Sequence, residues 1–253
     1  MIEKVVTVTM LGVFSLSFRG KRLRETLSRD TRSWQLMKYL VDSRGRTVGQ
    51  EELVRVLWQS EHFGKDPYGT IRVRLRRLRE NLDMIGLGDS RSGLVFYAQD
   101  KFFLNPDYTL ELDIQALRGL CRRAEDRSLP TDARLEACRG ALELCTGPYL
   151  ERSEPAPWLE SGRREATAQF RQLVLTAMDL SRETADGALC QALSSRVLCM
   201  SPGDEELNTR LMSFFISRGY SAEAVSHYTQ LARMAEARGG TGPAPDGVST
   251  HLI

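Results

Sequence analysis

The stretch that decides the fold reads TIRVRLRRLRENL, from Thr70 to Leu82. When successive residues are placed about 100° apart, as in an α-helix, its large aliphatic side chains fall on one narrow stripe that must face a core. The residues of this stripe are Ile71, Leu75, Leu78 and Leu82. Because five arginines occupy the remaining surface, the stretch predicts an amphipathic helix with a basic outward face.

The arginines of this helix predict a contact with duplex DNA. No acidic residue occurs between Asp66 and Glu80, and like charges on one helix face repel each other unless an anion is near. The planar guanidinium fits both a phosphate and the edge of guanine. From their angular positions, the residues expected to contact base edges are Thr70, Arg72, Arg76 and Arg77. The residues expected to contact the DNA backbone are Arg74, Arg79 and Lys101.

The segments on either side of this helix favour DNA over the alternative, a solvated basic face without a ligand. Residues 6–24 alternate between apolar and polar side chains, which predicts a small antiparallel sheet. Two short helices follow, over residues 30–45 and 50–58, joined by a tight turn that contains glycine. Asp66 and Pro67 provide a capping residue and a first-turn proline for the basic helix. Two apolar runs then flank residues 98–101 as a hairpin, so the order is that of a winged helix-turn-helix.

The rest of the chain differs in both pattern and charge. Residues 1–104 hold 19 Lys and Arg against 12 Asp and Glu, a net +7, whereas the remaining 16 and 21 give −5. From residue 107 onward the apolar spacing is helical throughout, and the glycine-rich residues 239–253 are expected to be a disordered tail. We therefore expect two domains, an α+β winged helix over residues 1–106 and an all-α domain over residues 107–238.

Composition and motifs argue against several classes of protein. No apolar run is long enough to span a bilayer, and the first residues carry no secretory signal pattern, so a cytoplasmic location is expected. The five cysteines have no Cys-x-x-Cys spacing and the three histidines lie far apart, so neither a metal nor another cofactor is expected. The chain also has no glycine-rich phosphate loop, Gly-x-Ser-x-Gly or His-Glu-x-x-His motif, which argues against an enzyme.

Both halves resemble known regulatory domains. The basic helix resembles the recognition helix of OmpR-type winged helices. The matching positions are Ile71, Val73, Leu75, Arg77, Leu78, Arg79 and Leu82. The run RGRTV at residues 44–48, followed by EEL at 51–53 and LW at 57–58, resembles the variant in bacterial transcriptional activator domain (BTAD) proteins, which include the SARP-like antibiotic regulatory proteins. The second half resembles their tetratricopeptide-like partner domain at Leu211, Gly219, Ala224, Tyr228 and Leu231.

This resemblance implies a sequence-specific DNA-binding transcriptional regulator, an activator that is bound at promoters and associated with the bacterial nucleoid. It also implies that the loop after the second helix contacts RNA polymerase, with Glu61, Lys65 and Asp66 as candidate residues. The helical domain would mediate self-association as a homodimer, or would receive a signal from an effector or partner protein, and no membrane contact is expected. The alternative is a tetratricopeptide-like adaptor whose winged helix binds protein rather than DNA.

Overall fold

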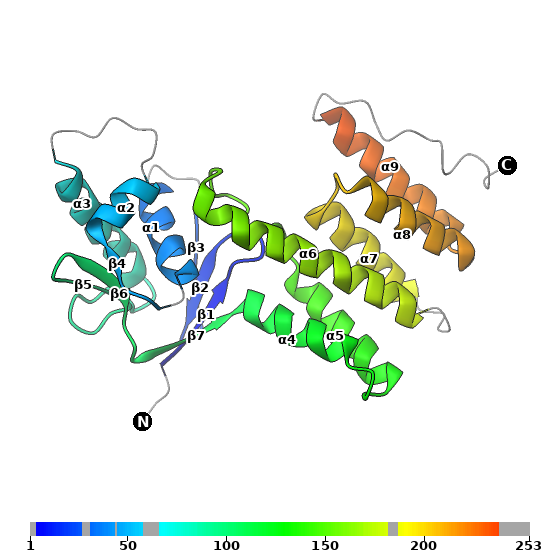
Figure 1. Cartoon of the computed structure of the whole chain (residues 1–253), viewed down its shortest axis with the longest axis horizontal. Helices are drawn as coiled ribbons and strands as arrows, with labels where there is room; N and C mark the ends of the chain where they lie inside the picture. The colour runs from blue at the N-terminus through cyan, green and yellow to red at the C-terminus, as the bar shows by residue number, and fades with distance from the viewer. Residues whose placement is uncertain (1–3, 27–30, 44, 58–65, 182–186, 238–253) are drawn as a thin grey trace. The chain divides into compact units, whose positions relative to one another are not determined.

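The computed structural model describes residues 4–26, 31–43, 45–57, 66–181 and 187–237. These residues form two compact units (Figure 1). Unit 1 comprises Met1–Ile114 and Tyr149–Gly162, and unit 2 comprises Gln115–Pro148 and Arg163–Ile253. None of the helices in the described part of the chain is both long and apolar enough to cross a bilayer. The tail expected at residues 239–253 lies outside the described residues.

Unit 1 begins with a four-stranded sheet in the order β3-β2-β1-β7. Its strands are β1 (Lys4–Thr9), β2 (Ser15–Phe18), β3 (Lys21–Arg24) and β7 (Tyr108–Leu112). The first three are antiparallel neighbours, as the alternating sequence predicts, and Val6 and Val8 are fully buried. The expectation of helix from residue 107 onward is wrong for β7, which pairs in parallel with β1. Its partner lies about a hundred residues earlier, so no local pattern shows the pairing.

Three helices and a second sheet complete the winged helix. The helices are α1 (Thr31–Asp42), α2 (Gln50–Leu57) and α3 (Pro67–Asp83). The second sheet has the order β4-β6-β5, from the strands β4 (Val48–Gly49), β5 (Val95–Ala98) and β6 (Lys101–Leu104). Asp66 caps α3 by accepting a hydrogen bond from the Gly69 amide at 2.8 Å, and Pro67 is the first helical residue, as predicted. The winged helix-turn-helix expected from the order of elements is therefore present.

Unit 1 is not continuous in sequence, because residues 149–158 return to it. We call these residues the return segment. Tyr149 pairs with Leu11, and the Leu150 amide donates to the Met10 carbonyl at 2.7 Å. The return segment and β7 therefore belong to unit 1 by their pairing, although the sequence places the domain boundary at residue 106.

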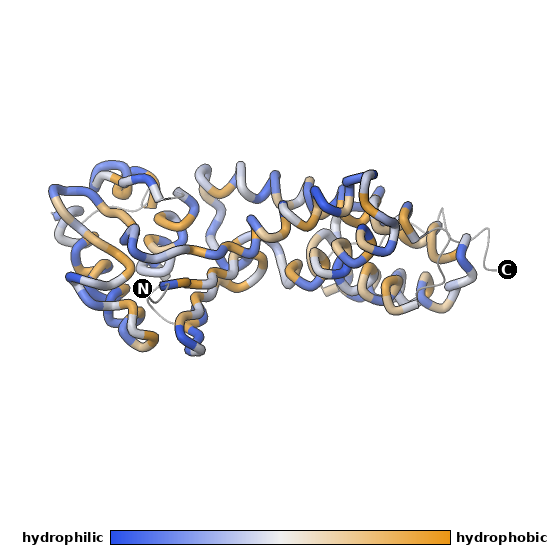
Figure 2. The backbone as a smooth tube through the Cα atoms, turned by 90° about the horizontal axis from the view of Figure 1, so that it is seen from below, coloured by the Kyte–Doolittle hydropathy of each residue, from blue (hydrophilic) through white to orange (hydrophobic). Residues whose placement is uncertain are grey.

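The part of unit 2 that the structure describes is helical. Its helices are α4 (Asp113–Glu125), α5 (Thr131–Leu144), α6 (Pro157–Leu180), α7 (Gly187–Met200), α8 (Glu205–Ser217) and α9 (Ser221–Ala237). α4 and α6 begin within unit 1 and continue into unit 2. Hydrophobic and hydrophilic residues alternate along these helices (Figure 2), and the apolar side of each is buried. The α8–α9 pair turns at Gly219, whose φ of 80° suits glycine, and the Tyr220 amide bonds to the Phe215 carbonyl at 2.8 Å as in a Schellman motif.

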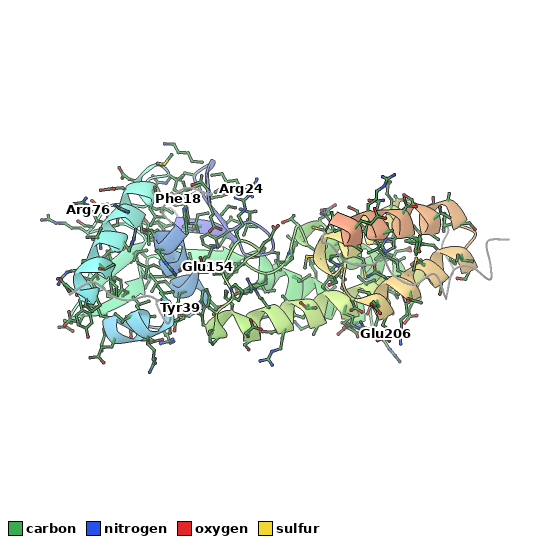
Figure 3. The ribbon with its side chains drawn as sticks, turned by 90° about the horizontal axis from the view of Figure 1, so that it is seen from above. Phe18, Arg24, Tyr39, Arg76, Glu154 and Glu206 are labelled. Atoms are coloured by element: carbon green, nitrogen blue, oxygen red, sulfur yellow. The ribbon has the colours of Figure 1, made fainter. Side chains whose placement is uncertain are left out.

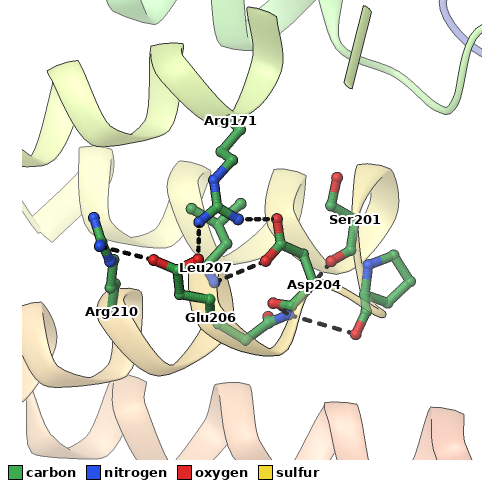
Figure 4. Close-up of polar contacts among 8 residues, drawn as sticks. Arg171, Ser201, Asp204, Glu206, Leu207 and Arg210 are labelled. Atoms are coloured by element: carbon green, nitrogen blue, oxygen red, sulfur yellow. Dashed lines mark hydrogen bonds and ion pairs between the residues drawn. The ribbon is translucent and has the colours of Figure 1, made fainter. Parts of the chain in front are cut away.

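Polar side chains join the helices of unit 2 both on the outside and in the interior. On the outside, Arg171 of α6 bonds to Asp204 and Glu206 at the start of α8 (Figure 4). Asp204 also caps α8 by accepting from the Leu207 amide at 3.0 Å. Inside, the buried ring of His227 on α9 lies between Ser194 of α7 and Asn208 of α8, at 2.8 Å from each.

Candidate nucleic-acid interface

The helix predicted to carry the arginines is present, and its orientation is as expected. Ile71, Leu75, Leu78 and Leu82 of α3 are the buried residues of the helix. Val73, on the other side, is 46% exposed, and the Arg76 side chain is 77% exposed and points away from unit 1 (Figure 3). The stripe of aliphatic side chains thus anchors α3 in the core and leaves its basic side open to solvent.

The residues predicted to contact base edges are on the accessible side of α3. Arg72, Arg76 and Arg77 are exposed, and Thr70 is half-buried. Arg72 lies 3.9 Å from the Asp66 carboxylate and Arg76 lies 3.3 Å from that of Glu80. Such exposed pairs are weak and can be exchanged for an anion at little cost. Among the residues that the structure describes, Arg77 has no ion-pair partner.

A shallow hollow of about 410 Å³ lies on the outward side of α3. Its lining brings Thr70, Val73, Arg74 and Arg77 together with Asp66 and Gly69 at the start of the helix. The Thr70 hydroxyl donates to the Asp66 carbonyl at 3.1 Å, so its lone pairs and methyl group remain available. Arg74, predicted as a backbone contact, therefore shares one surface with two of the residues predicted to contact bases.

Arg79 is engaged within unit 1. Its Nε and Nη2 donate to the Val95 carbonyl of β5 at 3.3 and 3.0 Å. Burial lowers the pKa of this guanidinium, and nearby Asp89 opposes that shift. The helical wheel places Arg79 on a flank of α3, but only the fold shows that the hairpin covers this flank. Its contact with the hairpin joins the wing to α3.

The wing is a two-residue hairpin, with Ala98 paired to Lys101 across the turn. Gln99 and Asp100 both have positive φ, 49° and 57°, which is the geometry of a type I′ turn. Lys101 is exposed at the start of β6, as predicted from its place at the tip.

Sequence reasoning missed the network that holds this wing against α2. The Gln50 side-chain amide donates to Asp100 at 2.6 Å and also bonds to the Tyr97 hydroxyl. Tyr97 donates to the Asp100 carboxylate at 2.8 Å. Burial, followed by the Asp100 contact, raises the pKa of Tyr97, and Arg72 opposes the shift from α3. Asp100 was the available signal for this network. An acidic residue in a turn is stabilised beside a helix N-terminus, and α2 begins at Gln50.

The remaining candidate residues are placed only in part. Glu61 and Lys65, expected to contact RNA polymerase, lie outside the described residues, whereas Asp66 is the cap of α3. In the described part of the chain, no three His, Cys, Asp or Glu side chains are grouped as metal ligands.

A helix-turn-helix with a hairpin wing, followed by antiparallel helix pairs, defines a winged-helix transcription regulator with a helical partner domain. Comparison with known proteins gives the family. The model described as "Bacterial transcriptional activator domain" matches residues 112–251, more than half of the chain, and "Transcriptional regulatory protein, C terminal" matches residues 22–90. The chain belongs to the family of regulators with a bacterial transcriptional activator domain, which confirms the family resemblance.

Individual relatives match over parts of their length. The sensory transduction protein BceR of Bacillus subtilis is 36% identical over 73 residues, which cover 27% of this chain and 31% of BceR. BceR of Halalkalibacterium halodurans is 38% identical over 53 residues, covering 21% and 22%. The chain thus spans less than a third of these curated relatives.

A solved structure shows the same fold over nearly the whole chain. Mycobacterium tuberculosis EmbR, in complex with a low affinity phosphopeptide, matches with a TM-score of 0.54 and 18% identity. The match covers 98% of this chain and 64% of that one. At this identity, the likeness concerns the fold.

Proposed function

We propose that this protein is a sequence-specific DNA-binding transcriptional regulator that activates its target promoters. The observation that carries the proposal is the outward side of α3. There, Arg77 is exposed and without an ion-pair partner in the described part of the chain, beside Thr70 and Arg74 in one hollow. A helix that presents such a surface from a helix-turn-helix fits the major groove, where arginine recognises guanine.

The residues of this surface would divide into two roles. Thr70, Arg72, Arg76 and Arg77 would contact base edges, and Arg74 and Lys101 would contact the DNA backbone. Arg79 would contribute mainly by holding the wing, because its guanidinium is bonded to the Val95 carbonyl.

The test is the salt dependence of binding to duplex DNA. A duplex selected from a random pool is titrated with the protein, and the fluorescence anisotropy of the duplex is followed at several salt concentrations. With two phosphate contacts per protomer, from Arg74 and Lys101, the affinity should fall roughly 12-fold between 50 and 200 mM salt, or roughly 150-fold if two protomers bind together. Arg77→Ala should weaken binding, whereas Arg127→Ala, which removes an exposed arginine of unit 2, should not. If no duplex is selected, or if binding does not depend on salt, the adaptor interpretation replaces this one.

The partners follow from this proposal. The regulator would act in the bacterial cytoplasm on promoter DNA at the nucleoid, and would contact RNA polymerase through the loop that holds Glu61, Lys65 and Asp66. Unit 2 would mediate homodimerisation or would receive an effector or partner protein. The phosphopeptide named with EmbR belongs to that protein, and it makes a phosphopeptide one ligand to test here.

A further inference from the structure

The return segment makes a dense set of contacts with α1. The Tyr149 hydroxyl donates to Asp42 at 2.5 Å, at the end of the helix. The rings of Trp158 and Tyr39 meet edge to face, with 5.2 Å between their centroids. Figure 3 labels Tyr39 on α1 and Glu154 in the return segment. Glu154 also lies 3.6 Å from Arg32, so the return segment contacts α1 near both of its ends.

A buried ion pair reinforces this attachment. Lys38 of α1 has no exposed surface, and its ammonium lies 2.7 Å from Glu25, which is also buried. The same ammonium donates to the Ser153 hydroxyl of the return segment at 2.9 Å. A buried charge must keep its partners, because leaving it unpaired is costly. Ser153 thus joins the return segment to the buried ion pair that includes Lys38 of α1.

α1 also contacts α2 and α3, the two helices of the helix-turn-helix that follow it. Ser33 donates to the Arg74 carbonyl of α3 at 3.1 Å. The Tyr39 hydroxyl bonds to Glu52 of α2. Tyr39 thus contacts both Trp158 and α2, and a single helix connects the return segment with the segments that meet DNA.

We propose that the return segment positions α1, and through it α3, for DNA binding, so that the affinity of unit 1 for DNA depends on residues 149–158. This inference rests on the proposed function, since DNA is the ligand whose affinity it concerns. Tyr149, Ser153 and Trp158 are positioning residues and do not contact DNA.

The experiment removes one contact at a time in the full chain. Trp158→Ala deletes the ring against Tyr39, Trp158→Phe keeps an aromatic ring there, and Ser153→Ala deletes the hydroxyl on Lys38. Glu151→Ala, an exposed position of the same segment, is the matched control. Each variant is measured for affinity to the selected duplex, for the salt dependence of binding, and for amide hydrogen exchange in α1, α3 and α8.

We expect Trp158→Ala to weaken DNA binding about three- to tenfold, the size of one edge-to-face aromatic contact. Its salt dependence should not change, because the phosphate contacts are retained. Exchange should become faster in α1 and α3 but not in α8, and Trp158→Phe and Glu151→Ala should resemble the wild type. Should Trp158→Ala unfold unit 1, Ser153→Ala gives the decisive comparison.

Unchanged affinity and unchanged exchange in α3, in both Ser153→Ala and a folded Trp158→Ala, would overturn the inference. This failure differs from that of the proposed function, which is a wild-type protein without salt-sensitive DNA binding. In that case the exchange measurement still decides whether the return segment positions α3.

Discussion

His227 predicts how the stability of unit 2 depends on pH. Its ring is fully buried, and the neighbouring side chains fix which nitrogen carries the proton. The Asn208 amide group donates to the Asp204 carbonyl at 2.7 Å, so its oxygen is the atom that faces His227 Nε2. Nε2 must therefore be protonated, and Nδ1 accepts from the Ser194 hydroxyl. Burial favours this neutral form, because the charged ring would lose its hydration.

The size of the effect follows from the shift in pKa. Burial lowers the pKa of His227 to about 4, against an ordinary value of about 6.5. The unfolded chain binds a proton below about pH 6.5, whereas the folded chain binds it only near pH 4. The contribution of the neutral His227 ring to the free energy of unfolding is therefore complete above pH 6.5 and is lost as the pH falls toward 4. Its size is roughly 3 kcal/mol.

The assay is urea unfolding followed by far-ultraviolet circular dichroism at a series of pH values. We compare the wild type with His227→Gln, whose amide can still bond to Asn208 and Ser194 but does not titrate. The carboxylates titrate in both proteins, so the difference between the two curves isolates the histidine. Between pH 7 and pH 4.5 the wild type should lose about 2 to 3 kcal/mol more than the variant. Parallel pH profiles would refute the reasoning, since they would mean that His227 is charged or solvated in the folded state.

Four other predictions test separate parts of the structure. Arg77→Ala should cost about 1–3 kcal/mol of binding to the selected duplex and should relax the choice at one base pair, measured with single-base variants of that duplex; an unchanged preference would contradict the orientation of α3. Arg79→Ala should weaken DNA binding and should also lower the free energy of unfolding of unit 1 by about 1.5–3 kcal/mol, because it removes a charged donor from a β5 carbonyl. A variant as stable as the wild type would mean that the bond between Arg79 and this carbonyl is absent in solution. Lys38→Met should destabilise unit 1 by about 3–5 kcal/mol, because it leaves the buried charge of Glu25 unpaired. Adding Glu25→Leu to the same chain should restore most of this loss, and thermal unfolding measures both variants. Gly219→Ala should cost about 1–2 kcal/mol in unit 2, because alanine resists a positive φ, and a wild-type melting temperature would show that the turn can relax.

Sequence predicted those parts of the fold whose signals are local. The spacing of aliphatic residues in α3 indicated its buried side, and Asp66 with Pro67 indicated its start. A hairpin around residues 98–101 was likewise expected from the two apolar runs beside it, although the turn is tighter, with Ala98 already paired to Lys101. Such signals lie within a few residues of the element that they specify, so a single sequence is enough to detect them.

The parts that sequence did not predict depend on contacts between distant residues. β7 is a short strand whose partner is β1, and the return segment finds its partners on α1 and near Met10. At the site, the helical wheel separated Arg77 from Arg79 by angle alone. It could not show that the hairpin covers Arg79 and leaves Arg77 open, because this depends on how the wing packs against α3.

The return of the chain to unit 1 also concerns its synthesis. A domain made of one continuous stretch can fold as soon as its last residue leaves the ribosome, but unit 1 completes its contacts only after Trp158 has been made. About fifty residues separate Leu104 from Trp158, a delay of roughly 3 to 10 s at ordinary rates of translation. During this interval Lys38 lacks Ser153, and the surface of α1 that the return segment later covers is open. The order of synthesis therefore gives α1 its contacts with Ser153 and Trp158 only after α4 and α5 have been made.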